Sequence, residues 1–162
     1  MGGGQEVTAD LPRALIWLDP GATTGYALLT DRYEFVCGQA FGLRPFGAWL
    51  DGTLHTYGAG AHLGWEAYRA LGPRSAESTV GLRIMGVAAW LAMEHGAQIL
   101  PEVSSEMRTP AAPAALKRLG WYEKGMPHAM DAARHLLAYI MRTGIAPDIV
   151  RAAFTEQVPE GM

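Results

Sequence analysis

The sequence has a single cysteine, no long apolar run and no excess of basic residues. One cysteine, Cys37, cannot form an intramolecular disulfide, and it excludes a zinc site built from cysteines. No segment reaches the run of about 18 apolar residues that a membrane span requires, and residues 1–5 lack the basic and then apolar pattern of a secretion signal. These absences predict a cytoplasmic protein with no membrane partner.

The chain also has little charge: 18% of its 162 residues are charged, 49% are apolar, and the formal net charge is −3. A chain of this length is expected to fold as one domain that buries roughly two thirds of the surface of its unfolded chain. We expect that domain over residues 13–146. It would lie between a Gly-rich N-terminal tail at 1–12 and a C-terminal tail at 147–162, which lacks a sustained apolar period.

A negative net charge argues at first against a nucleic-acid partner, because DNA-binding domains usually carry a basic excess. Residues 1–12 and 145–162, however, hold five of the 16 acidic side chains and only one of the 13 basic ones. The central part of the chain is therefore close to neutral, and the charge does not exclude DNA.

Apolar periodicity predicts a mixed α/β fold. An uninterrupted apolar run ends at Asp19-Pro20-Gly21, which is typical of a central strand buried on both faces and closed by a turn. The next two strands are joined by Asp31-Arg32, so the chain is expected to begin with an antiparallel meander. The expected strands are 14–18, 24–30, 33–40, 61–65 and 97–100. The expected helices are 44–58, 78–95 with Ser78 as its cap, 114–119 and 127–142.

Three acids and a histidine stand at the ends of these expected elements. Asp19 follows the first strand, Glu66 follows the fourth, and the last helix carries His128 and Asp131 near its start. His135 is expected on the same helical face as His128 and Asp131. Each residue alone has an ordinary structural explanation: a turn cap, a solvated acid or a helix cap.

Together, three carboxylates and an imidazole suit hard, oxygen-preferring cations such as Mg²⁺, and imidazole is also acceptable to Mn²⁺. Two such ions about 4 Å apart can activate a water and stabilise the leaving oxygen in phosphodiester cleavage. A metal-dependent nuclease site is therefore one interpretation of these residues.

The acids lie within short motifs, which are Leu18-Asp19-Pro20-Gly21, Thr24-Gly25-Tyr26-Ala27, Glu66 and His128-Ala129-Met130-Asp131-Ala132. In this order they resemble the RuvC family of Holliday junction resolvases, in the RNase H-like superfamily, over about residues 14–142. The resemblance implies an RNase H-like fold, a mixed five-stranded sheet flanked by helices. It also implies a divalent-metal-dependent endodeoxyribonuclease that cleaves four-way junctions and other branched DNA.

The resemblance further implies that Asp19, Glu66 and Asp131 are catalytic carboxylates holding two Mg²⁺ or Mn²⁺ ions, with Asp19 bridging both. Many members have a fourth carboxylate where this chain has His128, and some have histidine there. His128 would then be a metal ligand or a proton carrier. Hydrolysis would leave a 5′-phosphate and a 3′-hydroxyl.

Members of the family act as dimers in DNA recombination and repair, so a homodimer is expected. The helix at 78–95 is apolar nearly all round, so a second copy could cover one face, although burial within a single chain explains the pattern equally well. The small size resembles bacteriophage members, which act in the host cytoplasm. Phosphate contacts are expected from Arg69, Arg74, Arg108, Lys117, Arg118 and Lys124.

Other interpretations remain open. A different RNase H-like nuclease, acting on RNA/DNA hybrids or flap DNA, would keep the same acids, and a non-catalytic protein that binds branched DNA is a further alternative. The turn at 19–25 also resembles the phosphate loop of actin-like and sugar-kinase ATPases, whose second domain 162 residues are too few to supply. Trp65, Trp121 and Tyr122 are candidates for stacking on unpaired bases, although core packing explains Trp65 better.

Overall fold

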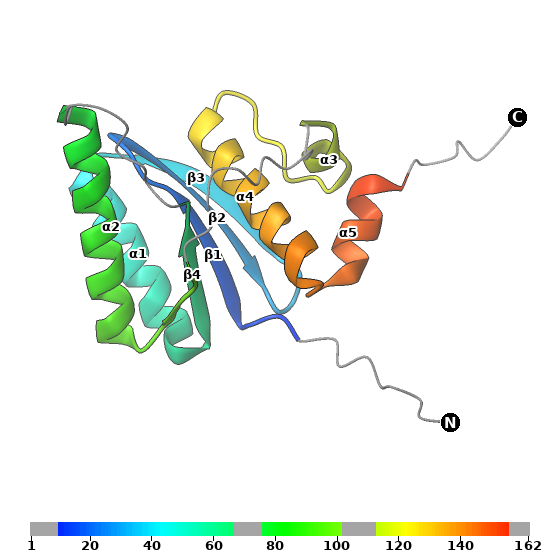
Figure 1. Cartoon of the computed structure of the whole chain (residues 1–162), viewed down its shortest axis with the longest axis horizontal. Helices are drawn as coiled ribbons and strands as arrows, with labels where there is room; N and C mark the ends of the chain where they lie inside the picture. The colour runs from blue at the N-terminus through cyan, green and yellow to red at the C-terminus, as the bar shows by residue number, and fades with distance from the viewer. Residues whose placement is uncertain (1–9, 67–75, 102–112, 156–162) are drawn as a thin grey trace, which may run out of the picture.

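The computed structural model describes residues 10–66, 76–101 and 113–155, in which a sheet lies between two groups of helices (Figure 1). The strands are β1 (Ala14–Asp19), β2 (Thr23–Thr30), β3 (Phe35–Phe41), β4 (Ala61–Trp65) and β5 (Gln98–Ile99). The helices are α1 (Leu43–Tyr57), the 3-10 turn η1 (Gly58–Gly60), α2 (Ala76–His95), α3 (Pro113–Arg118), α4 (Pro127–Thr143) and α5 (Pro147–Phe154).

The five strands form one sheet in the order β3-β2-β1-β4-β5. The pairs β1–β2 and β2–β3 are antiparallel, whereas β1–β4 and β4–β5 are parallel. β1 is the central strand, and its residues are buried almost throughout, as the continuous apolar run predicted. The predicted fold class is thus confirmed: a mixed five-stranded sheet, with the antiparallel meander first, flanked by helices.

Successive residues of β1 belong to different hydrophobic cores. Ala14, Ile16 and Leu18 pack in the core under α1 and α2, whereas Leu15 and Trp17 pack in the core under α4. Figure 1 shows these helices on opposite sides of the sheet. Because side chains alternate along a strand, Asp19 lies on the α4 face.

Every predicted element begins and ends within two residues of its predicted range, and the two largest differences are at the starts of β3 and α2. Tyr33 has a left-handed φ of 63° in the turn after β2, so β3 begins at Phe35 rather than at residue 33. Helix α2 begins at Ala76, so Ser78 lies inside the helix instead of capping it. The reason is that Ala76 and Glu77 are themselves good helix formers and extend the helix beyond the serine.

Helix α2 is the longest described helix, at 20 residues, and it packs on α1 and the sheet. Its inner face is buried through Ile84 and Ala88. Its outer face leaves Trp90 and Met93 exposed at 54% and 70%. Neither α2 nor any other helix in the described parts of the chain combines the length and apolarity needed to cross a membrane.

The segment expected to be a C-terminal tail begins with helix α5. Gly144 caps the end of α4 in the left-handed conformation, and it begins a three-residue connection to α5. Ile149 and Ala153 are buried in the core under α4, and the Arg118 guanidinium donates a hydrogen bond to the Ala153 carbonyl at 3.0 Å. Eight residues span little more than two turns, too short for the sequence to show a sustained period. Of the expected N-terminal tail, residues 1–9 lie outside the described residues.

Candidate active site

Two acids stand at the ends of the two neighbouring parallel strands β1 and β4. The parallel register pairs Leu18 with Trp65. Asp19 and Glu66 are the next residues on either strand, so their backbones lie roughly 5 Å apart. Strand order in the sheet therefore brings together two acids that are far apart in the sequence.

Helix α4 begins directly over this end of the sheet because Gly25 leaves room for it. The antiparallel register pairs Gly25 with Asp19, and α4 packs on β1 and β2. A Cβ atom at Gly25 would overlap the carbonyl group of His128 and lie 2.7 Å from the backbone nitrogen of Ala129. The glycine of the second sequence motif thus sets the distance between Asp19 and the side chains of α4.

Two histidines of α4 each contact one of the strand-end acids. His128 Nδ1 lies 2.9 Å from Asp19 Oδ2, and His135 Nε2 lies 3.1 Å from Glu66 Oε2. The histidines are seven residues apart, which is two helical turns, so they share one face of α4. Helical spacing in the sequence predicts His135 on this face but indicates no role for it.

Asp131 stands between these histidines along α4. Its carboxylate accepts a hydrogen bond from Arg134 Nη1 at 2.8 Å. Both side chains are well exposed, so water screens this pair and it adds little to stability. Asp131 also lies close enough to Asp19 to influence its ionisation. The four residues predicted for the site thus lie at one end of the sheet. They are Asp19, Glu66, His128 and Asp131.

The surroundings of Asp19 disfavour its charge. Burial raises the pKa of the Asp19 carboxyl above its ordinary value, the hydrogen bond with His128 opposes that rise, and the Asp131 carboxylate adds to it. A partly buried carboxylate beside a second carboxylate has negative charge that a bound cation would offset.

The donor set fits Mg²⁺ or Mn²⁺ by its chemistry, since it consists of carboxylate oxygens and imidazole nitrogens. Among the residues that the structure describes, no three His, Cys, Asp or Glu side chains converge closely enough to hold a metal ion. Each acid instead contacts a histidine or arginine of α4. These contacts join partly exposed side chains, which can adopt other rotamers.

No family model matches the sequence, and no curated protein matches it significantly. Solved structures do match the fold. Thermus thermophilus RuvC in complex with a Holliday junction substrate aligns with 81% of this chain and 96% of its own, at a TM-score of 0.62 and 16% sequence identity. A second structure of Thermus thermophilus RuvC aligns over the same shares, at a TM-score of 0.59 and 15% identity. The chain has a RuvC-like fold.

Three of the six basic residues predicted to contact DNA lie in the described part of this RuvC-like fold. Arg118 hydrogen-bonds to the backbone of α5, so its guanidinium has a structural partner. The ammonium of Lys117 lies over the Tyr122 ring, 4.8 Å from its centroid. Lys124 is exposed in the connection between α3 and α4. Outside the described residues lie Arg69, Arg74 and Arg108.

Two of the three aromatic candidates for base stacking are buried. Trp65 and Trp121 pack in opposite cores, and Trp121 stacks on Phe35 with ring centroids 4.4 Å apart. No motif or pattern in the sequence points to Phe41, which is 71% exposed at the end of β3. β3 pairs with β2 without a bulge, so Phe41 lies on the same face as Phe35. Phe41 therefore lies on the α4 face of the RuvC-like fold, at the end of the sheet that carries Asp19.

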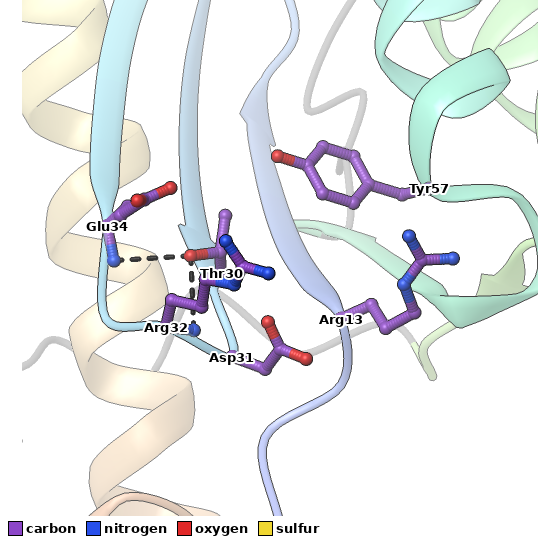
Figure 2. A pocket seen from close by; sticks show the side chains of 6 residues that line it. All are labelled: Arg13, Thr30, Asp31, Arg32, Glu34 and Tyr57. Atoms are coloured by element: carbon purple, nitrogen blue, oxygen red, sulfur yellow. Dashed lines mark hydrogen bonds between the residues drawn. The ribbon is translucent and has the colours of Figure 1, made fainter.

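A hollow of about 200 Å³ lies at the opposite end of the sheet (Figure 2). Arg13, which precedes β1, stands across from the turn between β2 and β3, and Tyr57 from the end of α1 forms another wall. The length of β1 separates this hollow from Asp19. It is therefore distinct from the candidate site.

Proposed function

We propose that this protein is an endonuclease that cleaves four-way junctions and other branched DNA by metal-dependent phosphodiester hydrolysis. The observation that carries the proposal is the meeting of Asp19 and Glu66, from adjacent strands, with His128 and Asp131 from the start of α4. The RuvC-like fold supports the choice of substrate, since one neighbour is a complex with a Holliday junction substrate.

In this proposal Asp19, Glu66, His128 and Asp131 hold two Mg²⁺ or Mn²⁺ ions, which when bound activate a water and stabilise the leaving oxygen. Asp19, which lies beside Glu66 and contacts His128 at the start of α4, would be a ligand of both ions. His128 Nδ1 orients the Asp19 carboxylate, which leaves Nε2 of the same ring to bind an ion or to carry a proton. The products are a 5′-phosphate and a 3′-hydroxyl.

A panel of substrates of equal length tests this function: a four-way junction, a flap, an RNA/DNA hybrid and a matched linear duplex. We expect Mg²⁺ or Mn²⁺ to support cutting of the junction and EDTA to abolish it. Preferential cutting of the hybrid or the flap would instead assign another RNase H-like activity. Binding of the junction without any cutting would make the protein a non-catalytic branched-DNA binder.

The outer face of α2 supports a homodimer, which would present two sites to the symmetric strands of a junction. Leu82, Trp90 and Met93 recur at helical spacing on this face and are exposed. A second copy of the chain would bury this apolar stripe, because apolar side chains at such spacing form the usual contact between helices.

We expect Trp90→Glu to convert the dimer into a monomer, since it places a charge at the centre of the apolar stripe. The measurement is molar mass by light scattering after size-exclusion chromatography. Leu43→Glu is the matched control, because it adds the same charge at an exposed apolar position on α1. A Trp90→Glu protein that keeps the mass of the wild type would contradict this arrangement.

We expect Phe41→Ala to weaken binding to a four-way junction about tenfold, because stacking of a base on an aromatic ring contributes about 1–3 kcal/mol. Phe41→Trp should retain the affinity. Fluorescence anisotropy in EDTA measures binding without cutting. The control is Val36→Ala, which removes an exposed apolar side chain from the opposite face of β3. Equal affinities of the Phe41→Ala and Val36→Ala proteins would show that Phe41 does not contact the DNA.

A further inference from the structure

We infer that His135 is a positioning residue that holds the Glu66 carboxylate beside Asp19. The inference rests on the function proposed above, because it gives a role to Glu66 in that site. His135 Nε2 and Glu66 Oε2 lie 3.1 Å apart, and both side chains are partly buried, at 28% and 29% exposed.

The contact between His135 and Glu66 joins helix α4 to the end of β4, two elements that do not pack closely on each other. Helix α4 packs mainly on β1, β2 and β3, whereas Glu66 follows β4, on the far side of β1. The His135 imidazole bridges this span from the face of α4 that also carries His128. It is also close enough to Asp19 to act on its charge. His135 therefore contacts Glu66 and lies within electrostatic range of Asp19.

A free glutamate side chain rotates about three bonds, and fixing it reduces its conformational entropy. The contact with the His135 imidazole offsets that loss before any ion arrives. It also directs one carboxylate oxygen toward α4 and leaves the second oxygen available. Residues that orient a metal ligand in this way typically change metal affinity by 10- to 100-fold when they are removed.

A second histidine–carboxylate pair lies outside the candidate site, where it joins two helices. His95 Nε2 lies 2.7 Å from Asp51 Oδ1, where it joins α1 to α2 on the other face of the sheet. Neither residue is near Asp19 or Glu66. This pair supplies a matched control, because its removal breaks the same type of contact at a distance from the site.

The test compares Mn²⁺ binding of the full chain without DNA, by isothermal titration calorimetry, for wild type, His135→Leu, His135→Gln and His95→Leu. We expect His135→Leu to weaken Mn²⁺ binding about tenfold or more. His135→Gln should restore most of the affinity, because its amide nitrogen can donate a hydrogen bond to the Glu66 carboxylate. His95→Leu should bind Mn²⁺ as the wild type does. Thermal melting followed by circular dichroism checks that each variant is folded.

Wild-type Mn²⁺ affinity in the His135→Leu protein would overturn the inference. An equal loss of affinity in His135→Gln and His135→Leu would also overturn it, because the imidazole would then act through packing. A wild-type chain that binds no Mn²⁺ would also overturn it. A chain that binds Mn²⁺ with the expected pattern but cuts no branched DNA would overturn the proposed function and leave the role of His135 standing.

Discussion

Asp19→Asn should reduce metal-dependent cutting of a four-way junction by at least about a thousandfold, the order of loss seen when a central catalytic group is removed. The substitution keeps the size of the side chain and an oxygen that can accept the hydrogen bond from His128. It removes only the negative charge that would bind the cations. Binding of the junction should therefore survive, which initial cutting rates and anisotropy titrations measure separately.

The same substitution should raise the melting temperature of the cation-free protein at neutral pH. The pKa of Asp19 is raised in the folded chain above its ordinary value of 3.8, so the folded state binds this proton more tightly than the unfolded state does. Stability is therefore lost as pH rises from the ordinary pKa through the folded one. A neutral asparagine removes that loss.

Asp51→Asn is the control for both measurements, because Asp51 also pairs with a histidine but lies between α1 and α2. It should leave cutting unchanged. Wild-type cutting by the Asp19→Asn protein would refute the proposed mechanism.

Gly25→Ala should have the largest effect on stability, a loss of about 3 kcal/mol in the free energy of unfolding. The added Cβ would overlap the carbonyl group of His128, which is backbone and cannot rotate away as a side chain can. Helix α4 would have to move off the sheet, and His128 would separate from Asp19. Urea denaturation measures the stability, and the junction assay should show that cutting is lost although every acid is still present.

Gly52→Ala provides the matched control for Gly25→Ala. Gly52 lies inside α1, where an added Cβ would meet nothing within 4 Å. Because alanine favours helix over glycine, this change should stabilise the protein by roughly 0.5–1 kcal/mol. A Gly25→Ala protein as stable and as active as the wild type would show that the glycine does not set the position of α4.

The sequence predicted the parts of this fold that depend on local pattern. The apolar run before Asp19 identified the central strand, and the acids after β1 and β4 were expected at strand ends, where the structure has them. The contact between His135 and Glu66 could not be predicted, because it depends on how α4 crosses the sheet. Periodicity shows which face of a helix points inward but not which strand each residue meets.

The same limit explains why the sequence does not predict the role of Arg118 or the exposure of Phe41. Arg118 was expected to contact phosphates, yet it anchors α5, a helix too short to be recognised from its period. Phe41 follows the predicted strand 33–40, and no pattern in the sequence indicates that its side chain is exposed. Its exposure follows from the edge position of β3 and the extent of α4, and neither is encoded near residue 41.

The alternation along β1 and β4 also restricts how the length of this chain can change in evolution. Asp19 ends β1, whose neighbouring residues fill opposite cores, and Glu66 follows β4, whose alternate residues Ala61, Leu63 and Trp65 fill the core under α1 and α2. Deleting one residue within either strand would turn its acid toward α1 and α2, away from the histidines. Insertions in the connections between elements leave this alternation unchanged. A lineage that keeps this pair of acids can therefore vary its loops freely, but it can lengthen or shorten these two strands only by even numbers of residues.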